Sequence, residues 1–72
     1  MSDPLVRIGN EIRQLRLERG LSQEAMAELA SLSRAYYGRI ERGDTDFSLS
    51  TLMKLGAALG MATSDILKRV GI

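Results

Sequence analysis

The chain has 72 residues, with ten Lys and Arg against nine Asp and Glu, and it contains no His and no Cys. A chain of this length folds as one small domain, which we expect to span residues 1–72. Without Cys or His it has no disulfide, no thiol nucleophile and none of the usual zinc ligands, so we expect no metal and no cofactor. Its carboxylates form no recognisable acid–base pair, and we expect no enzyme activity.

We expect no targeting signal at the start of the chain, because Met1 to Pro4 include an acid and no long apolar stretch follows. The longest apolar run is also far shorter than the roughly 20 residues of a membrane span. We therefore expect a cytoplasmic protein without a membrane partner. The net charge of +1 means that a partner of strongly negative charge must be bound by well-placed cations rather than by many of them.

The first predicted helix carries apolar residues at intervals of three and four, which places Leu5, Ile8, Ile12 and Leu15 on one face. Its end is predicted at Gly20, since glycine suits the left-handed position after a helix.

Two short helices with a brief connection follow. Ser22 and Ser33 are predicted N-caps, and Gly43 is the predicted end of the second of these helices. The connection, residues 31–33, is so short that the helices must cross steeply and closely. A small residue is needed where they cross, and Ala27 is expected there.

The remaining residues predict two more helices. Ser48 is the expected cap of a helix that ends at Gly60, and a fifth helix is expected from about residue 63. The predicted fold is therefore all-α, with five helices in a compact domain. The inward residues of the fourth helix are expected to be Leu52, Leu55, Gly56 and Leu59, and the fifth helix carries Ile66, Leu67 and Val70.

Residues 33–42 differ from an ordinary amphipathic helix in their outward residues. If Met26, Ala30, Leu32, Tyr37 and Ile40 are buried, the opposite side of this helix carries three arginines separated by small residues. That outward set is Arg34, Ala35, Gly38, Arg39 and Arg42.

The segment "RIGNEIRQLRLERGLSQEAMAELASLSRAYYGRIERG", followed by "SLSTLMKLGAALGM", resembles the lambda-repressor-like or Xre family of helix-turn-helix DNA-binding proteins. The resemblance covers about residues 5–70. It implies a bacterial or phage transcriptional regulator, a repressor or controller, with its motif at about residues 22–42 and its recognition helix at about 33–42. In that family the recognition helix enters the major groove of double-stranded DNA.

The resemblance also implies a role for each matching residue. Arg34 matches a base-reading position, where arginine can donate two hydrogen bonds to guanine. Gln23 matches a position that contacts a phosphate at a helix N-terminus. The expected base-contacting residues are Arg34, Ala35, Gly38 and Arg39, and the expected backbone-contacting residues are Ser22, Gln23, Ser33, Tyr36, Arg42 and Thr45.

Two further expectations come from the resemblance. Arg16 and Glu41 match positions that form a partly buried ion pair, to which we assign a structural role. The protein is also expected to bind a two-fold operator as a homodimer, because one recognition helix covers only a few base pairs. The candidate interface residues are Phe47, Leu49, Met61, Ala62, Leu67 and Val70, and the alternative is that several of them complete the core. No small-molecule effector site is evident.

The chain departs from the family pattern at several positions. Ser31 stands where the turn commonly has glycine, and a left-handed backbone there costs a non-glycine residue about 1–2 kcal/mol. Residues 44–47 replace a loop that is often basic, and two acids in it either weaken DNA binding or face away. Phe47 and the "SRAYY" segment are similar to the small controller proteins of restriction–modification systems.

A second function remains open from the sequence. Leu17, Leu29 and Met53 are apolar at positions that look outward. They favour a protein-interaction or antitoxin-like helical module with little DNA specificity.

Overall fold

The computed structural model describes residues 3–72, which form five α-helices and no strand. The helices are α1 (Pro4–Glu18), α2 (Gln23–Leu29), α3 (Arg34–Arg42), α4 (Leu49–Leu59) and α5 (Thr63–Val70). The all-α prediction is confirmed. None of the helices in residues 3–72 is long and apolar enough to cross a membrane.

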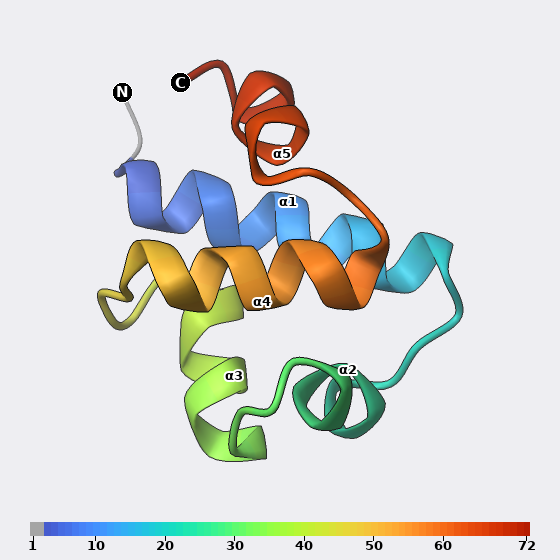
Figure 1. The fold of residues 1–72 in the computed structure, drawn as a ribbon. Coiled ribbons are helices and arrows are strands. Elements are labelled where there is room, and N and C mark those ends of the chain that lie inside the picture. The colour runs from blue at the N-terminus through green and yellow to red at the C-terminus, as the bar shows by residue number, and fades with distance from the viewer. Residues whose placement is uncertain (1–2) are drawn as a thin grey trace.

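Helix α1 lies at the centre of the molecule and packs against α3, α4 and α5. Figure 1 shows α4 crossing in front of α1, α5 above them, and α2 and α3 together below. The buried apolar residues of all five helices form one core, in which Tyr37, Ile12, Met26, Leu55 and Ile66 are among the largest fully buried side chains. Helices α2 and α3 therefore project as a pair from one side of the α1–α4 layer.

The helix boundaries follow the local signals in the sequence. The hydroxyl groups of Ser22, Ser33 and Ser48 accept hydrogen bonds from backbone N–H groups three residues later, at 3.0–3.1 Å. The predicted glycine ends are confirmed at Gly20 and Gly43, which have positive φ angles of 68° and 73°. Helix α5 begins at Thr63 as expected, although no side chain caps it.

Two glycines allow α1 and α3 to approach closely. A Cβ atom added to Gly9 would lie 2.3 Å from the carbonyl oxygen of Ile40, and one added to Gly43 would lie 2.6 Å from a methyl carbon of Val6. No side chain fits at either place. The end of α3 is thereby held directly against α1.

The connection between α2 and α3 keeps its left-handed residue although that residue is not glycine. Ser31 has a φ of 56°, and Leu32 donates a backbone hydrogen bond of 2.8 Å to Ala27. Ala27 is buried where the two helices meet, as predicted. This short turn therefore forms at some cost in backbone strain.

Candidate nucleic-acid interface

A buried ion pair joins α1 to the end of α3. Arg16 donates from Nε to Oε2 of Glu41 at 2.6 Å and from Nη2 to Oε1 at 3.2 Å, so the contact is bidentate. The two side chains are only 9% and 2% exposed. Another guanidinium nitrogen of Arg16 donates to the backbone oxygen of Leu21 at 2.8 Å. This pair lies at the positions where the sequence resemblance implied it.

Two more donors complete the environment of Glu41. The Tyr37 hydroxyl donates to Oε2, and the Gln23 amide donates to Oε1 at 3.0 Å. Burial alone raises the pKa of Glu41, but the hydrogen bonds from Arg16, Tyr37 and Gln23 outweigh it and hold that pKa below its ordinary value. Conversely, burial and the bond to Glu41 raise the pKa of Tyr37. One ionised carboxylate thus connects α1, α2 and α3.

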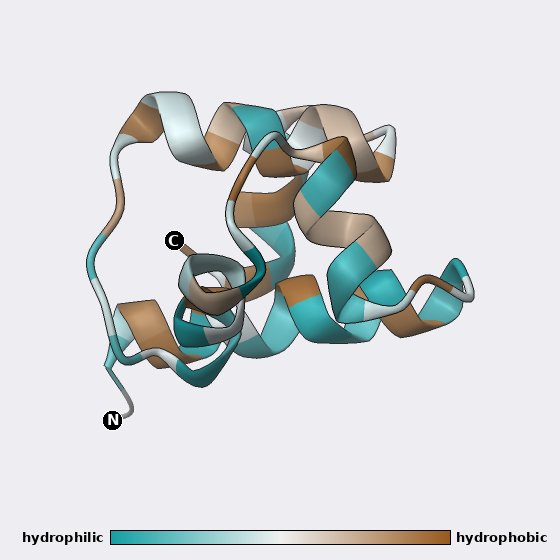
Figure 2. Cartoon of the chain, turned by 90° about the horizontal axis from the view of Figure 1, so that it is seen from below, coloured by the Kyte–Doolittle hydropathy of each residue, from teal (hydrophilic) through white to brown (hydrophobic). Residues whose placement is uncertain are grey.

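The opposite face of α3 is open to solvent. Arg34, Ala35 and Arg39 are exposed there. Within residues 3–72, the side chains of Arg34 and Arg39 form no hydrogen bond or ion pair. Figure 2 looks onto the side from which α2 and α3 project, where α3 is drawn largely in hydrophilic colours. This face offers guanidinium groups whose donors are available to an external acceptor.

Gly38 is on this face but is not open. It is buried, because the side chains of Arg34 and Arg42 fold over it. A Cβ atom at this position would lie 3.3 Å from Nη1 of Arg42 and 3.7 Å from Nη1 of Arg34. Gly38 therefore leaves room for two arginine side chains, and the base contact expected from the resemblance stays a prediction.

The expected backbone-contacting residues surround this face. Ser22 and Ser33 are exposed at the N-termini of α2 and α3, where their hydroxyl groups serve as caps. The hydroxyl groups of Tyr36 and Thr45 both donate to the backbone oxygen of Asp46, at 3.4 and 3.2 Å. Arg42 forms an exposed ion pair with Asp44, with Nε 2.9 Å from Oδ2.

Two features of the site were not anticipated from the sequence. The amide of Gln23, expected to reach a phosphate, faces Glu41 and uses one of its N–H groups there. Gly9, which lets α1 contact the backbone of α3, was not singled out. An isolated glycine within a helical pattern is a signal of such close contact, whereas nothing local connects Gln23 to Glu41.

The predicted dimer-interface residues fall into three groups. Val70 is only 8% exposed and belongs to the core, so its assignment to an interface is corrected: its side chain closes the packing of α5 on α1. Phe47, Met61 and Leu67 are partly buried against the same core. Leu49, at 66% exposure, and the small Ala62 are exposed.

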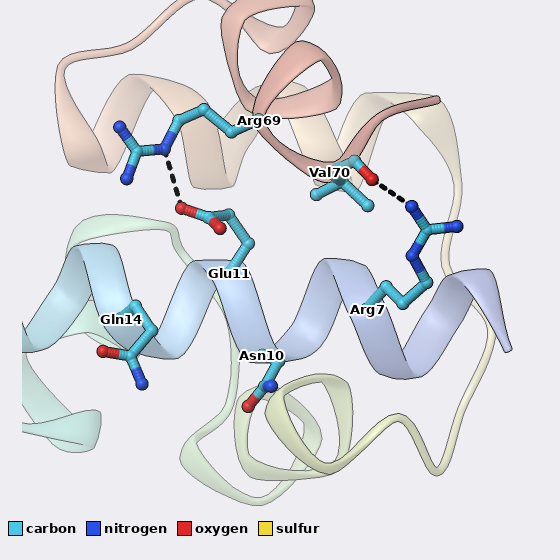
Figure 3. A pocket seen from close by; sticks show the side chains of 6 residues that line it. All are labelled: Arg7, Asn10, Glu11, Gln14, Arg69 and Val70. Carbon is cyan, nitrogen blue, oxygen red and sulfur yellow. Dashed lines mark hydrogen bonds and ion pairs between the residues drawn. The ribbon is translucent and has the colours of Figure 1, made fainter. Parts of the chain in front are cut away.

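A hollow of about 220 Å³ lies elsewhere, between α1 and α5. Figure 3 shows two contacts across it: Arg69 with Glu11 at 2.7 Å, and Arg7 with the backbone oxygen of Val70. The carboxylate of Glu11 raises the pKa of Arg69. Within residues 3–72, no group of three or more acids could hold a metal ion. The hollow is thus an inter-helix contact, separate from the exposed face of α3.

A family model described as helix-turn-helix, HTH_3, matches residues 12–66. Among curated relatives, the control protein C.MunI from Mycoplasma sp is 42% identical over 67 residues, covering 92% of this chain and 90% of that protein. An immunity repressor protein of Bacillus phage phi105 is 46% identical over 59 residues, which are 82% of this chain and 41% of the repressor.

Solved structures have the same fold. The restriction–modification controller protein C.AhdI from Aeromonas hydrophila superposes with a TM-score of 0.84 at 42% identity, over 86% of this chain and 94% of that one. The clp gene regulator ClgR from Corynebacterium glutamicum reaches a TM-score of 0.92 at 26% identity, over 97% and 74% of the two chains.

Proposed function

The chain belongs to the helix-turn-helix family HTH_3, and we propose that it is a bacterial or phage transcriptional regulator that reads double-stranded DNA with α3 in the major groove. This proposal rests on the difference between the two faces of α3, one packed and the other exposed. One side is fixed to α1 and α2 through Glu41, and the other presents Arg34 and Arg39 without a partner within residues 3–72. A helix held this way can offer base-reading side chains in a defined orientation.

In this proposal residues 1–72 act as one DNA-binding unit. Arg34, Ala35 and Arg39 contact base edges, and Arg34 is the main reader because its fork of donors matches guanine. The residues around α3 contact the sugar–phosphate backbone. They are Ser22, Gln23, Ser33, Tyr36, Arg42 and Thr45.

We further propose that the protein binds a two-fold operator as a homodimer. Two relatives are named control proteins, C.MunI and C.BamHI, and the similar structure C.AhdI is named a restriction–modification controller protein. These names support a controller or repressor role. Two recognition helices related by a two-fold axis would contact half-sites about 34 Å apart. The exposed apolar residues Leu49 and Met53 of α4 supply the candidate contact.

Selection of bound duplexes from a random DNA pool tests this function. We expect an enriched sequence with two-fold symmetry. Arg34→Ala should reduce discrimination at one base position in each half-site by about 1–3 kcal/mol. Arg13→Ala, which removes the same exposed group from α1, is the matched control and should leave the base preference unchanged. Binding without any enriched sequence would contradict the proposal.

A second candidate is a protein-interaction module. It is favoured by the exposure of Leu17, Leu29 and Met53, which is 49%, 58% and 57% respectively. Large apolar side chains that remain in solvent are typical of surfaces that partners cover when they lie together. This function would be preferred if DNA selection enriched no sequence and a protein partner co-purified with the chain in defined stoichiometry.

A further inference from the structure

The ion pair between Arg42 and Asp44 is located at the edge of the proposed DNA-binding face. It joins the last residue of α3 to the loop that follows, with 2.9 Å between Nε of Arg42 and Oδ2 of Asp44. The side chains are 59% and 55% exposed, so the pair adds little to folding stability. A functional effect of this ion pair therefore depends on how it positions the side chain of Arg42.

Asp44 occupies only one edge of the Arg42 guanidinium. With Nε held by the carboxylate, Nη1 lies over Gly38, 3.3 Å from where a Cβ atom would be. Nη1 of Arg34 is 3.7 Å from that same point. Two guanidinium groups therefore lie side by side on α3, although they carry like charges. The carboxylate of Asp44 reduces the resulting repulsion.

The neighbouring acid of the loop is placed differently. The carboxylate of Asp46 accepts a hydrogen bond of 2.8 Å from the backbone N–H of Phe47 and forms no ion pair within residues 3–72. Asp44 and Asp46 thus carry the same charge two residues apart, while only Asp44 contacts an arginine of α3. A comparison of the two acids therefore distinguishes the effect of direct contact with Arg42 from the effect of negative charge in the loop.

We propose that Asp44 is a specificity-determining positioning residue, which holds Arg42 beside Arg34 over Gly38 and keeps Arg42 from pairing with whichever phosphate is near. The inference rests on the proposed DNA-binding function. A held guanidinium loses less side-chain freedom when it binds an acceptor at a matching place. At any other place Asp44 must be displaced, or it repels the phosphate.

The hold of Asp44 on Arg42 affects non-specific and operator-specific DNA binding differently. Binding to arbitrary sequence depends almost entirely on phosphate contacts made by mobile cations. Asp44 weakens that mode because it partly neutralises Arg42. Binding to the selected operator gains from an Arg42 that is already in position. The ratio of operator affinity to non-operator affinity is therefore the quantity that Asp44 controls.

The test measures both affinities for Asp44→Asn across a series of salt concentrations, using the selected operator and a scrambled duplex of equal length. We expect affinity for the scrambled duplex to rise about two- to fivefold at low salt. Its dependence on salt should steepen by about one phosphate contact per protomer. Operator affinity should stay level or fall, so the ratio decreases, while the unfolding midpoint is unchanged.

Two controls make the result decisive. Asp46→Asn removes the same charge from the same loop and should leave the affinity ratio unchanged. In an Arg42→Gln background, Asp44→Asn should no longer alter the ratio. The inference is overturned if Asp44→Asn raises both affinities equally, or if its effect persists without Arg42. A wild-type protein that prefers no sequence would instead refute the proposed function, and this inference with it.

Discussion

Glu41 connects three helices through one carboxylate, and its pKa makes that connection sensitive to acid. The pKa of Glu41 is held below the ordinary value of 4.5 in the folded protein. Its contribution to stability is therefore fully present above that pH, and it is lost as pH falls through the lower pKa of the folded state. We expect the free energy of unfolding, measured by urea titration, to drop on acidification below about pH 4.5.

The variant Glu41→Gln isolates this contribution from that of the other carboxylates. It leaves the buried guanidinium of Arg16 without a counter-charge, and we expect a loss of about 3–5 kcal/mol at neutral pH. The milder Gln23→Ala removes one of the donors and should cost about 1–2 kcal/mol. The acid-dependent loss should be smaller in Glu41→Gln than in the wild type. Equal acid dependence in both proteins would show that Glu41 does not contribute to it.

At the level of single residues, local signals predicted contacts between near neighbours, whereas the distant Arg16–Glu41 pair was expected only from the family resemblance and other distant contacts were missed. The serine caps and glycine ends were predictable because each involves contacts within a few residues. The role of Gln23 was not, because its partner is 18 residues away along the chain. Gly38 was assigned to the correct face, but the two arginines that cover it are visible only in three dimensions.

The turn between α2 and α3 stores backbone strain at one residue. Ser31 is exposed and has a φ of 56°, in the region that favours glycine. We expect Ser31→Gly to raise the free energy of unfolding by about 0.5–1 kcal/mol, because relief of the strain exceeds the added freedom of the unfolded chain. Chemical denaturation followed by circular dichroism measures this difference.

The same substitution on a regular helix should have the opposite sign. Ser64 is exposed in α5 and has an ordinary helical backbone, so Ser64→Gly is expected to destabilise by up to about 1 kcal/mol. If both variants were destabilised alike, the left-handed conformation at Ser31 would not be a source of strain.

The packing of whole helices was easier to predict, since the inward residues of α4 are those expected from periodicity.

Self-association depends on the surface of the whole molecule, and the exposure of the apolar side chains indicates which part of that surface is available for it. Leu49 is 66% exposed at the start of α4, and Met53, one turn later, is 57% exposed. These two are the most exposed large apolar side chains near the predicted interface, whereas Val70 is buried in the core. We therefore expect Leu49 to lie in the contact between the two copies of the proposed homodimer.

Leu49→Glu tests this contact. Because Leu49 is exposed, the variant should keep its helical circular dichroism spectrum and lose only the part of the unfolding free energy that comes from dimer assembly. In a two-fold dimer the two introduced glutamates would face each other, and their repulsion should dissociate the dimer in sedimentation equilibrium. Operator binding should then become weaker and require more protein, since one half-site is read at a time. Leu29→Glu, equally apolar and 58% exposed on α2, is the matched control and should remain dimeric. A Leu49→Glu protein that stays dimeric would move the interface away from the start of α4.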